Sequence, residues 1–174
     1  NNNKLLCPLS GWEDKIELET EVLNLFVRDI STVLENAKLN TVVLRNHPDF
    51  TNKNGWSNQL SNELENKGYK CELQDCSISI TELACKYKFI AGFASTSLRD
   101  LRNSCQKLKI IGFKSVSKYY FDDPQFTFGE SLGIDWIEED GTFKKEIFKK
   151  NVNFQIDRKN IVESINECLI KKPS

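Results

Sequence analysis

The chain has 174 residues, of which 39% are hydrophobic, and its 24 basic and 25 acidic residues give a net charge of −1. This length and apolar content suit one domain with its own core. Because the charges are balanced and dispersed, they exclude a basic nucleic-acid-binding surface, and we expect no nucleic-acid partner. No stretch approaches the roughly 18 uninterrupted apolar residues of a membrane helix, so no transmembrane segment is predicted.

The first part of the chain alternates strand and helix patterns. Lys4 to Leu9 is a short apolar run, and the following Ser10-Gly-Trp-Glu13 has the spacing of a helix-capping box. Apolar residues then recur every three or four positions to about Lys38, which predicts an amphipathic helix. Thr41 to Arg45 predicts a second strand, and Pro48 favours an extended conformation for the preceding His47.

The same alternation continues to residue 113. A second helix over Trp56 to Lys67 ends at Gly68, a third strand covers Tyr69 to Leu73, and Ser79-Ile-Thr-Glu82 caps a short helix. The remaining predicted elements are a strand at Lys88 to Phe93, a helix through Leu98, Leu101 and Cys105, and a strand at Lys107 to Phe113. This last strand is apolar at its centre and should be buried on both faces.

Residues 114–150 are less regular and rich in aromatic side chains, so we predict a long loop region with one short helix near Phe143 to Phe148. A final helix is expected through Ile161, Ile165, Cys168 and Leu169. Strands that alternate with helices predict a parallel sheet with helices on both faces. We therefore predict a doubly wound, Rossmann-like α/β fold that forms a single domain over residues 1–174.

The cysteines are Cys7, Cys71, Cys76, Cys85, Cys105 and Cys168. They form no C-x-x-C pair, and most lie within apolar periodic segments, which is typical of reduced core residues in a cytosolic protein. We predict no metal site, and a cytoplasmic location that allows peripheral attachment to the inner membrane face. The sequence contains no methionine, even at position 1, and we interpret it as a piece of a longer protein.

Ligands of open α/β sheets bind beyond the carboxyl ends of the strands, where the winding direction reverses. If the strand order is 3-2-1-4-5, the reversal lies between the first and fourth strands and brings together Ser10-Gly11 after the first strand and Ser95-Thr96-Ser97 after the fourth. The only histidine, His47, follows the second strand beside them. Hydroxyl groups at a helix N-terminus suit a phosphate, although the usual role of such residues is to cap the helix. A lone histidine, likewise, most commonly bonds a backbone carbonyl.

The stretch Arg45-Asn-His-Pro48 resembles the basic-x-His-Pro motif, and Gly92-Phe-Ala-Ser-Thr-Ser-Leu98 the Ser-Ser/Thr motif, of bacterial glycosyltransferases that use CMP-activated sugars. These are the sialyltransferases, the capsular polysialyltransferases and the related Kdo transferases. These enzymes have two Rossmann-like domains that face each other across a cleft, which is called the GT-B arrangement. The resemblance places this chain in the C-terminal, donor-binding half.

The resemblance also implies roles for individual residues. His47 would contact the donor phosphate and stabilise the departing CMP as the catalytic residue of this half. Arg45, Ser95, Thr96 and Ser97 would complete the phosphate and nucleotide site with Ser10 and Gly11, and Pro48 would fix the loop of His47. The CMP-sugar is then the donor substrate, with no further cofactor, and a glycan acceptor would bind a missing N-terminal domain.

Two features depart from the family pattern. Arg45 stands in place of the more usual lysine, which keeps the charge but changes its geometry. The family's general base lies in an acidic-acidic-Gly motif upstream of the His-Pro motif, whereas Glu138-Glu-Asp-Gly141 comes after both donor motifs and predicts an exposed turn. We therefore expect the chain alone to be inactive in transfer.

Two alternatives remain open from the sequence. The first is a non-catalytic nucleotide-binding or interaction domain of the same fold. The second is a phospho-receiver module, for which Asp75, Ser95 and Lys114 follow the third, fourth and fifth strands. The receiver site also needs acidic residues directly after the first strand, where this chain has Ser10-Gly-Trp12.

Overall fold

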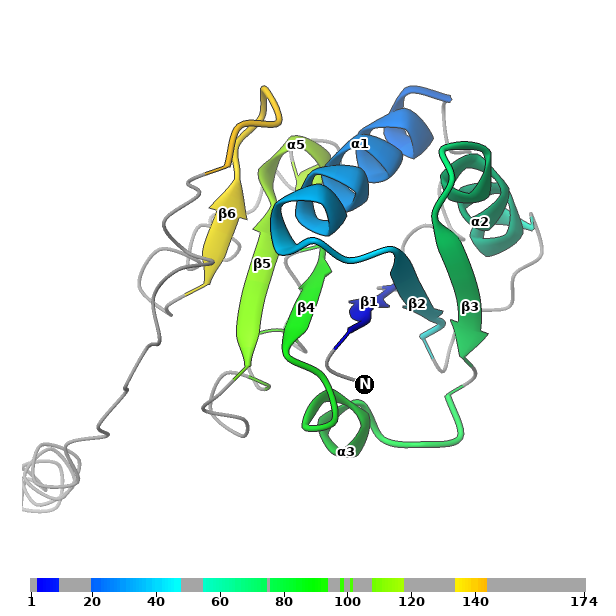
Figure 1. Ribbon diagram of the computed structural model, residues 1–174, viewed down its shortest axis with the longest axis vertical. Coiled ribbons are helices and arrows are strands. Elements are labelled where there is room, and N and C mark those ends of the chain that lie inside the picture. Colours follow the sequence, from blue (N-terminus) through cyan, green and yellow to red (C-terminus); the bar gives the residue numbers. More distant parts are fainter. Residues whose placement is uncertain are drawn as a thin grey trace, which may run out of the picture.

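The computed structural model describes residues 3–9, 20–47, 55–74, 76–93, 98, 101, 108–117 and 134–143. These residues form a six-stranded sheet flanked by helices, which confirms the predicted α/β fold class (Figure 1). The strands are β1 (Leu5–Pro8), β2 (Thr41–Arg45), β3 (Lys70–Gln74), β4 (Phe89–Gly92), β5 (Lys109–Phe113) and β6 (Asp135–Ile137). The helices are α1 (Thr20–Ala37), α2 (Trp56–Asn66), α3 (Ile80–Ala84) and α5 (Lys114–Ser117).

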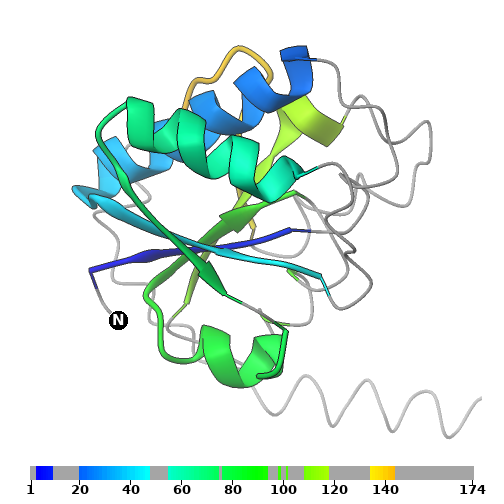
Figure 2. The same ribbon diagram turned by 90° about the vertical axis from the view of Figure 1, so that its right-hand side faces the viewer.

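The sheet is parallel throughout, with the strand order β3-β2-β1-β4-β5-β6. The chain adds strands in one direction from β1 to β3 and in the other direction from β4 to β6. The winding therefore reverses between β1 and β4, so the order 3-2-1-4-5, on which the predicted site location is conditional, is present. Figure 2 shows α1, α2 and α5 on one face of this sheet and α3 on the opposite face.

Both faces of the central strands are buried because each strand sends alternate side chains into two separate core clusters. In β1, Leu5 and Cys7 belong to the cluster under α1 and α2, whereas Leu6 belongs to the cluster on the α3 face. Phe26 of α1 joins three elements of the first cluster. Its ring centroid lies 5.0 Å from that of Trp56 in α2 and 5.9 Å from that of Phe113 in β5, both edge to face.

Several predicted element ends are confirmed. The strand Thr41–Arg45 is β2 as predicted, and Gly68 after α2 has a φ of 91°, which favours glycine. The Ser79 side chain accepts a hydrogen bond from the Glu82 backbone N–H at 3.2 Å and so caps α3. Lys38 follows α1 with a φ of 56°, which agrees with the predicted end of that helix.

The prediction of a long loop over residues 114–150 is wrong in two places. Helix α5 follows β5 directly, and β6 adds a sixth strand by pairing Ile111 with Asp135 and Phe113 with Ile137. Phe143 forms an isolated antiparallel bridge with Ile137 rather than starting the predicted helix, because the 138–142 turn brings it back beside β6. The predicted Ser10 capping box, Cys105, the rest of the Phe143–Phe148 helix and the final helix lie outside the described residues.

The predicted state of the cysteines is correct only in part. Cys7, Cys71 and Cys76 are not disulfide-bonded, and Cys7 is buried, whereas Cys85 is disulfide-bonded. Cys85 is the exposed C-cap residue of α3, where Leu83 and Ala84 take the two buried positions. The disulfide-bonded cysteine is thus at an exposed position outside the apolar core, whereas Cys7 lies within the core.

Candidate functional site

The pairing between β1 and β4 ends early at the place where the winding reverses. Their ladder joins Leu5 to Phe89 and Leu6 to Ile90, yet β1 extends to Pro8 and β4 to Gly92. The ladders on either side run to the strand ends, at Pro8–Arg45 and Gly92–Gly112. Pro8 has no N–H to donate, so it cannot extend the ladder as other residues would. The carboxyl ends of β1 and β4 are thus the candidate ligand-binding edge.

Arg45 and His47 lie at the carboxyl end of β2, one strand away from this reversal. Arg45 is the last residue of β2 and is only 5% exposed, and His47 follows two residues later, half-buried. The Leu9 N–H donates to the Arg45 carbonyl at 2.9 Å, which joins the end of β1 to the end of β2. Two of the predicted site residues are therefore at the predicted edge of the sheet.

The Arg45 guanidinium is directed at main-chain carbonyl groups. Its Nη2 donates to the Ile78 carbonyl at 2.9 Å, and its Nη1 donates to the Asn46 carbonyl at 3.3 Å. The sequence motif does not indicate these contacts, because Ile78 lies 33 residues away, in the segment before α3. Direct contact between Arg45 and a phosphate stays a prediction.

The other predicted site residues lie outside the described residues. They are Ser10, Gly11, Pro48, Ser95, Thr96 and Ser97. Their convergence with His47 also stays a prediction. The described residues establish only where the strands before these segments end. In the chain, β1 ends just before Ser10, β2 just before Pro48, and β4 just before the hydroxyl segment.

The strand order excludes the phospho-receiver alternative. Receiver domains have the order 2-1-3-4-5, in which the third strand lies beside the first and its terminal aspartate enters the site. Here β3 is an edge strand, separated from β1 by β2. Lys114 also has a partner in this structure, because its Nζ lies 2.8 Å from a carboxylate oxygen of Glu138.

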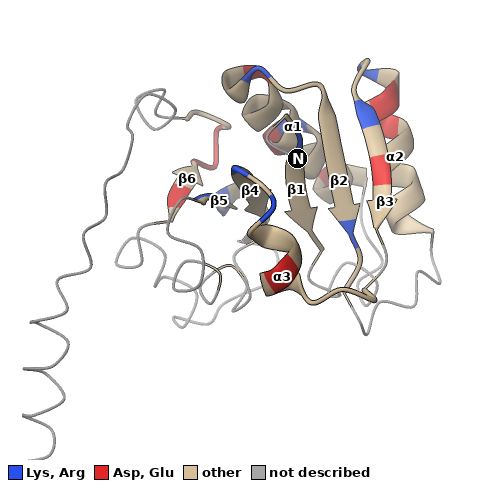
Figure 3. Cartoon of the chain, turned by 60° about the horizontal axis from the view of Figure 1, so that its bottom comes forward, with Lys and Arg blue, Asp and Glu red and all other residues tan. Residues whose placement is uncertain are grey.

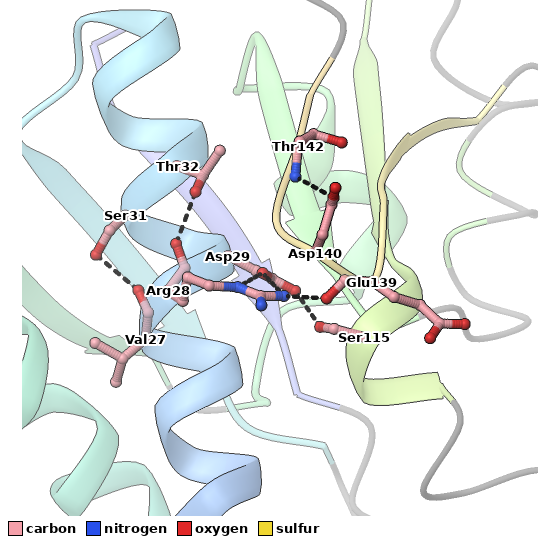
Figure 4. Close-up of polar contacts among 9 residues, drawn as sticks. All are labelled: Val27, Arg28, Asp29, Ser31, Thr32, Ser115, Glu139, Asp140 and Thr142. Atoms are coloured by element: carbon pink, nitrogen blue, oxygen red, sulfur yellow. Dashed lines mark hydrogen bonds and ion pairs between the residues drawn. The ribbon is translucent and has the colours of Figure 1, made fainter.

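A second polar cluster joins α1 to α5 and to the turn after β6 (Figure 4). Asp29 is fully buried and accepts a hydrogen bond from the Ser115 hydroxyl at Oδ2 and one from Arg28 Nε at Oδ1, the latter at 2.9 Å. Arg28 Nη2 also donates to the Glu139 carbonyl at 3.1 Å. Burial raises the pKa of Asp29, and the bonds from Ser115 and Arg28 only partly oppose this shift.

One feature of the sequence indicates this polar cluster. Asp29 follows Phe26 by three positions and precedes Val33 by four, so an acidic residue occupies a core position of an amphipathic helix. An acid at such a position needs a buried partner. Its partner Ser115 is 86 residues away and could not be identified from periodicity.

The segment Glu138-Glu-Asp-Gly141 forms the exposed turn that the sequence predicts. The Gly141 N–H donates to the Glu138 carbonyl at 2.9 Å, and Gly141 has a φ of 84°. The Thr142 N–H donates to Asp140 Oδ1 at 2.8 Å, and this bond lowers the pKa of Asp140. These contacts close a turn and give the two glutamates and Asp140 no shared site.

Charge and metal-ligand geometry add few candidates in the described part of the chain. Figure 3 shows acidic segments on α2, β3 and α3, and basic segments in β3 and at the end of β2. Within the described ranges, no three His, Cys, Asp or Glu side chains come close enough to hold a metal ion. Among the helices described, none has the length and apolar character needed to cross a membrane.

Comparison of the sequence with protein-family models and with curated proteins gave no match.

Proposed function

We propose that this chain binds a CMP-activated sugar at the carboxyl ends of its central strands, as the donor-binding domain of a glycosyltransferase. The transferred sugar would be sialic acid or a related sugar, and the acceptor a glycan. The observation that carries the proposal is the position of Arg45 and His47 at the end of β2, next to the reversal between β1 and β4. The two motifs that resemble CMP-sugar transferases both follow strands that end at this edge.

The chemistry of such a site is mainly electrostatic. When the bond between the sugar and the phosphate breaks, negative charge develops on the departing CMP. A histidine that hydrogen-bonds or protonates that phosphate stabilises the charge where it develops. Cationic or hydrogen-bond-donating groups near the end of β2 would stabilise this phosphate charge. NAD-binding domains instead have an acidic residue near this edge, which holds a ribose hydroxyl and would repel a phosphate.

The test compares two ligands that differ only in the phosphate. CMP and cytidine are titrated by calorimetry into the 174-residue chain, with uridine monophosphate as the control for base recognition. The proposal predicts that CMP binds more tightly than cytidine, because the phosphate supplies the main contact. Equal binding of CMP and cytidine would contradict the proposal.

A further inference from the structure

Arg45 holds main-chain groups on two different segments. Its side chain is almost wholly buried at the end of β2, and its guanidinium donates to the carbonyls of Ile78 and Asn46. A guanidinium can make both bonds at once because its donors lie in a rigid plane and point in different directions. These two bonds use two of the five N–H donors of the guanidinium and fix its orientation.

The Ile78 carbonyl is a firm attachment point. Ile78 packs against the core cluster on the α3 face. The next residue, Ser79, is tied to α3 by two bonds, since its side chain accepts from the Glu82 N–H and its carbonyl accepts from the Leu83 N–H at 3.0 Å. Arg45 therefore anchors the end of β2 to a segment that is itself held in place.

The bond to Asn46 acts directly on the backbone that leads to His47. The Asn46 carbonyl belongs to the planar peptide unit that contains the His47 N–H. The Asn46 N–H donates to the Gln74 carbonyl at 3.2 Å, so the Asn46 backbone is held from both sides. The direction in which the chain enters His47 thus depends on the Arg45 guanidinium.

We infer that Arg45 acts on the site as a positioning residue, which orients His47 through the Asn46 peptide and the Ile78 segment. The inference rests on the proposed function insofar as His47 is the residue that meets the donor. A lysine would keep the charge but has no planar fork to hold two carbonyls in different directions.

The first experiment uses the single histidine of the chain as its own reporter. The ring signals of His47 are recorded by nuclear magnetic resonance without ligand, in the wild type and in Arg45→Lys. The inference predicts that the signals shift or broaden in Arg45→Lys. Arg28→Lys is the matched control, because Arg28 also donates to a main-chain carbonyl but lies on α1, and it should leave the His47 signals in place. Unchanged His47 signals in Arg45→Lys would overturn the inference.

The second experiment separates positioning from direct binding by a double-mutant cycle. If Arg45 acts through His47, Arg45→Lys weakens CMP binding in the wild type but changes it less than about twofold in the His47→Ala background. If Arg45 contacts the phosphate itself, the loss in that background stays roughly tenfold or more, as for a charge-assisted bond. The second result would overturn the inference while leaving the proposed function intact.

Two further controls keep the test decisive. If the wild type fails to bind CMP, the proposed function fails, but the ligand-free His47 signals still test the positioning role. If Arg45→Lys does not fold, Ser79→Ala loosens the same anchor from the α3 side, and the inference predicts that the His47 signals shift in this variant. Signals that stay in place in a folded Ser79→Ala protein would then count against the inference.

Discussion

The Ser115 hydroxyl donates a hydrogen bond to the buried carboxylate of Asp29, and this single contact fastens the start of α5 to the middle of α1. Both side chains are excluded from water, with exposed fractions of 1% and 0%. A buried carboxylate that loses a donor cannot replace it with solvent. Loss of this contact should therefore lower the stability of the fold.

We expect Ser115→Ala to lower the free energy of unfolding by about 1–3 kcal/mol, because one Asp29 oxygen would be left buried without its donor. Chemical denaturation measures the change. Thr32→Ala is the control, since its hydroxyl donates at 3.0 Å to the Arg28 carbonyl within the same helix and its loss leaves no buried carboxyl group without a donor. A loss for Ser115→Ala no larger than for Thr32→Ala would show that the Asp29 contact contributes little.

The raised pKa of Asp29 predicts a specific pH dependence of stability. The folded protein holds this proton more tightly than the unfolded chain, so ionising Asp29 costs more free energy in the folded protein than in the unfolded chain. Its contribution to stability should therefore rise as the pH falls through the folded pKa and level off below the unfolded value of about 3.9. The difference in unfolding free energy between the wild type and Asp29→Asn, measured from pH 7 downward, should grow in favour of the wild type. A difference that is flat or shrinks with falling pH would contradict the assignment.

Trp136 of β6 lies against Gly112 of β5 so closely that a Cβ at position 112 would be 2.4 Å from the indole ring. Gly112→Ala should thus displace the indole and destabilise the protein by about 1–3 kcal/mol, the usual cost of overpacking. Hydrogen exchange should show the loss first in β6, whose pairing with β5 the indole covers. Adding Trp136→Leu makes room and should recover part of the stability. If the double variant is no more stable than Gly112→Ala alone, this contact is not the cause.

Gly141 and Gly68 form a matched pair for separating backbone strain from steric overlap. Both have positive φ, but a Cβ at Gly141 would lie 2.9 Å from Arg28 Nε, whereas a Cβ at Gly68 would meet nothing within 4 Å. Gly68→Ala should cost about 1–2 kcal/mol for the left-handed conformation alone. Gly141→Ala should cost more and should disturb the Arg28 contacts with Asp29 and Glu139. Equal losses of unfolding free energy in the two variants would show that Arg28 moves aside freely.

The parts of the fold that could be predicted are those with local causes. The β2 strand, the cap at Ser79 and the positive φ of Gly68 each follow from a few neighbouring residues. The parallel sheet follows from alternation of strands and helices, since parallel neighbours need crossover connections, but alternation does not distinguish the order 3-2-1-4-5 from 2-1-3-4-5. These signals are short-range or topological, so one sequence was enough to give them.

The missed parts depend on contacts between distant segments. Strand β6 has only three residues, which are too few for a recognisable alternation. It forms by pairing with β5, where Trp136 lies opposite Gly112 and Ile137 opposite Phe113. Likewise, the basic-x-His-Pro motif shows that Arg45 is charged but not where its side chain points. Its bond to the Ile78 carbonyl depends on where the segment before α3 lies relative to the sheet. The candidate site was thus predictable as a location at one edge of the sheet, but not as a set of contacts.

The sharpest prediction on function concerns His47. His47→Ala should weaken CMP binding by roughly tenfold or more, since a charge-assisted hydrogen bond contributes about 1.5–3 kcal/mol. Cytidine binding should be unchanged, because the lost contact is to the phosphate. Thermal unfolding should also be little affected, since His47 lies beyond the end of β2 and is only half-buried. Ser95→Ala is a poorer test, because it also removes the helix cap that the sequence predicts, which would contribute about 1 kcal/mol. The prediction is tested by titrating CMP and cytidine into the wild type and His47→Ala and by measuring the thermal unfolding of both proteins. If His47→Ala binds CMP as tightly as the wild type does, His47 has a structural role only.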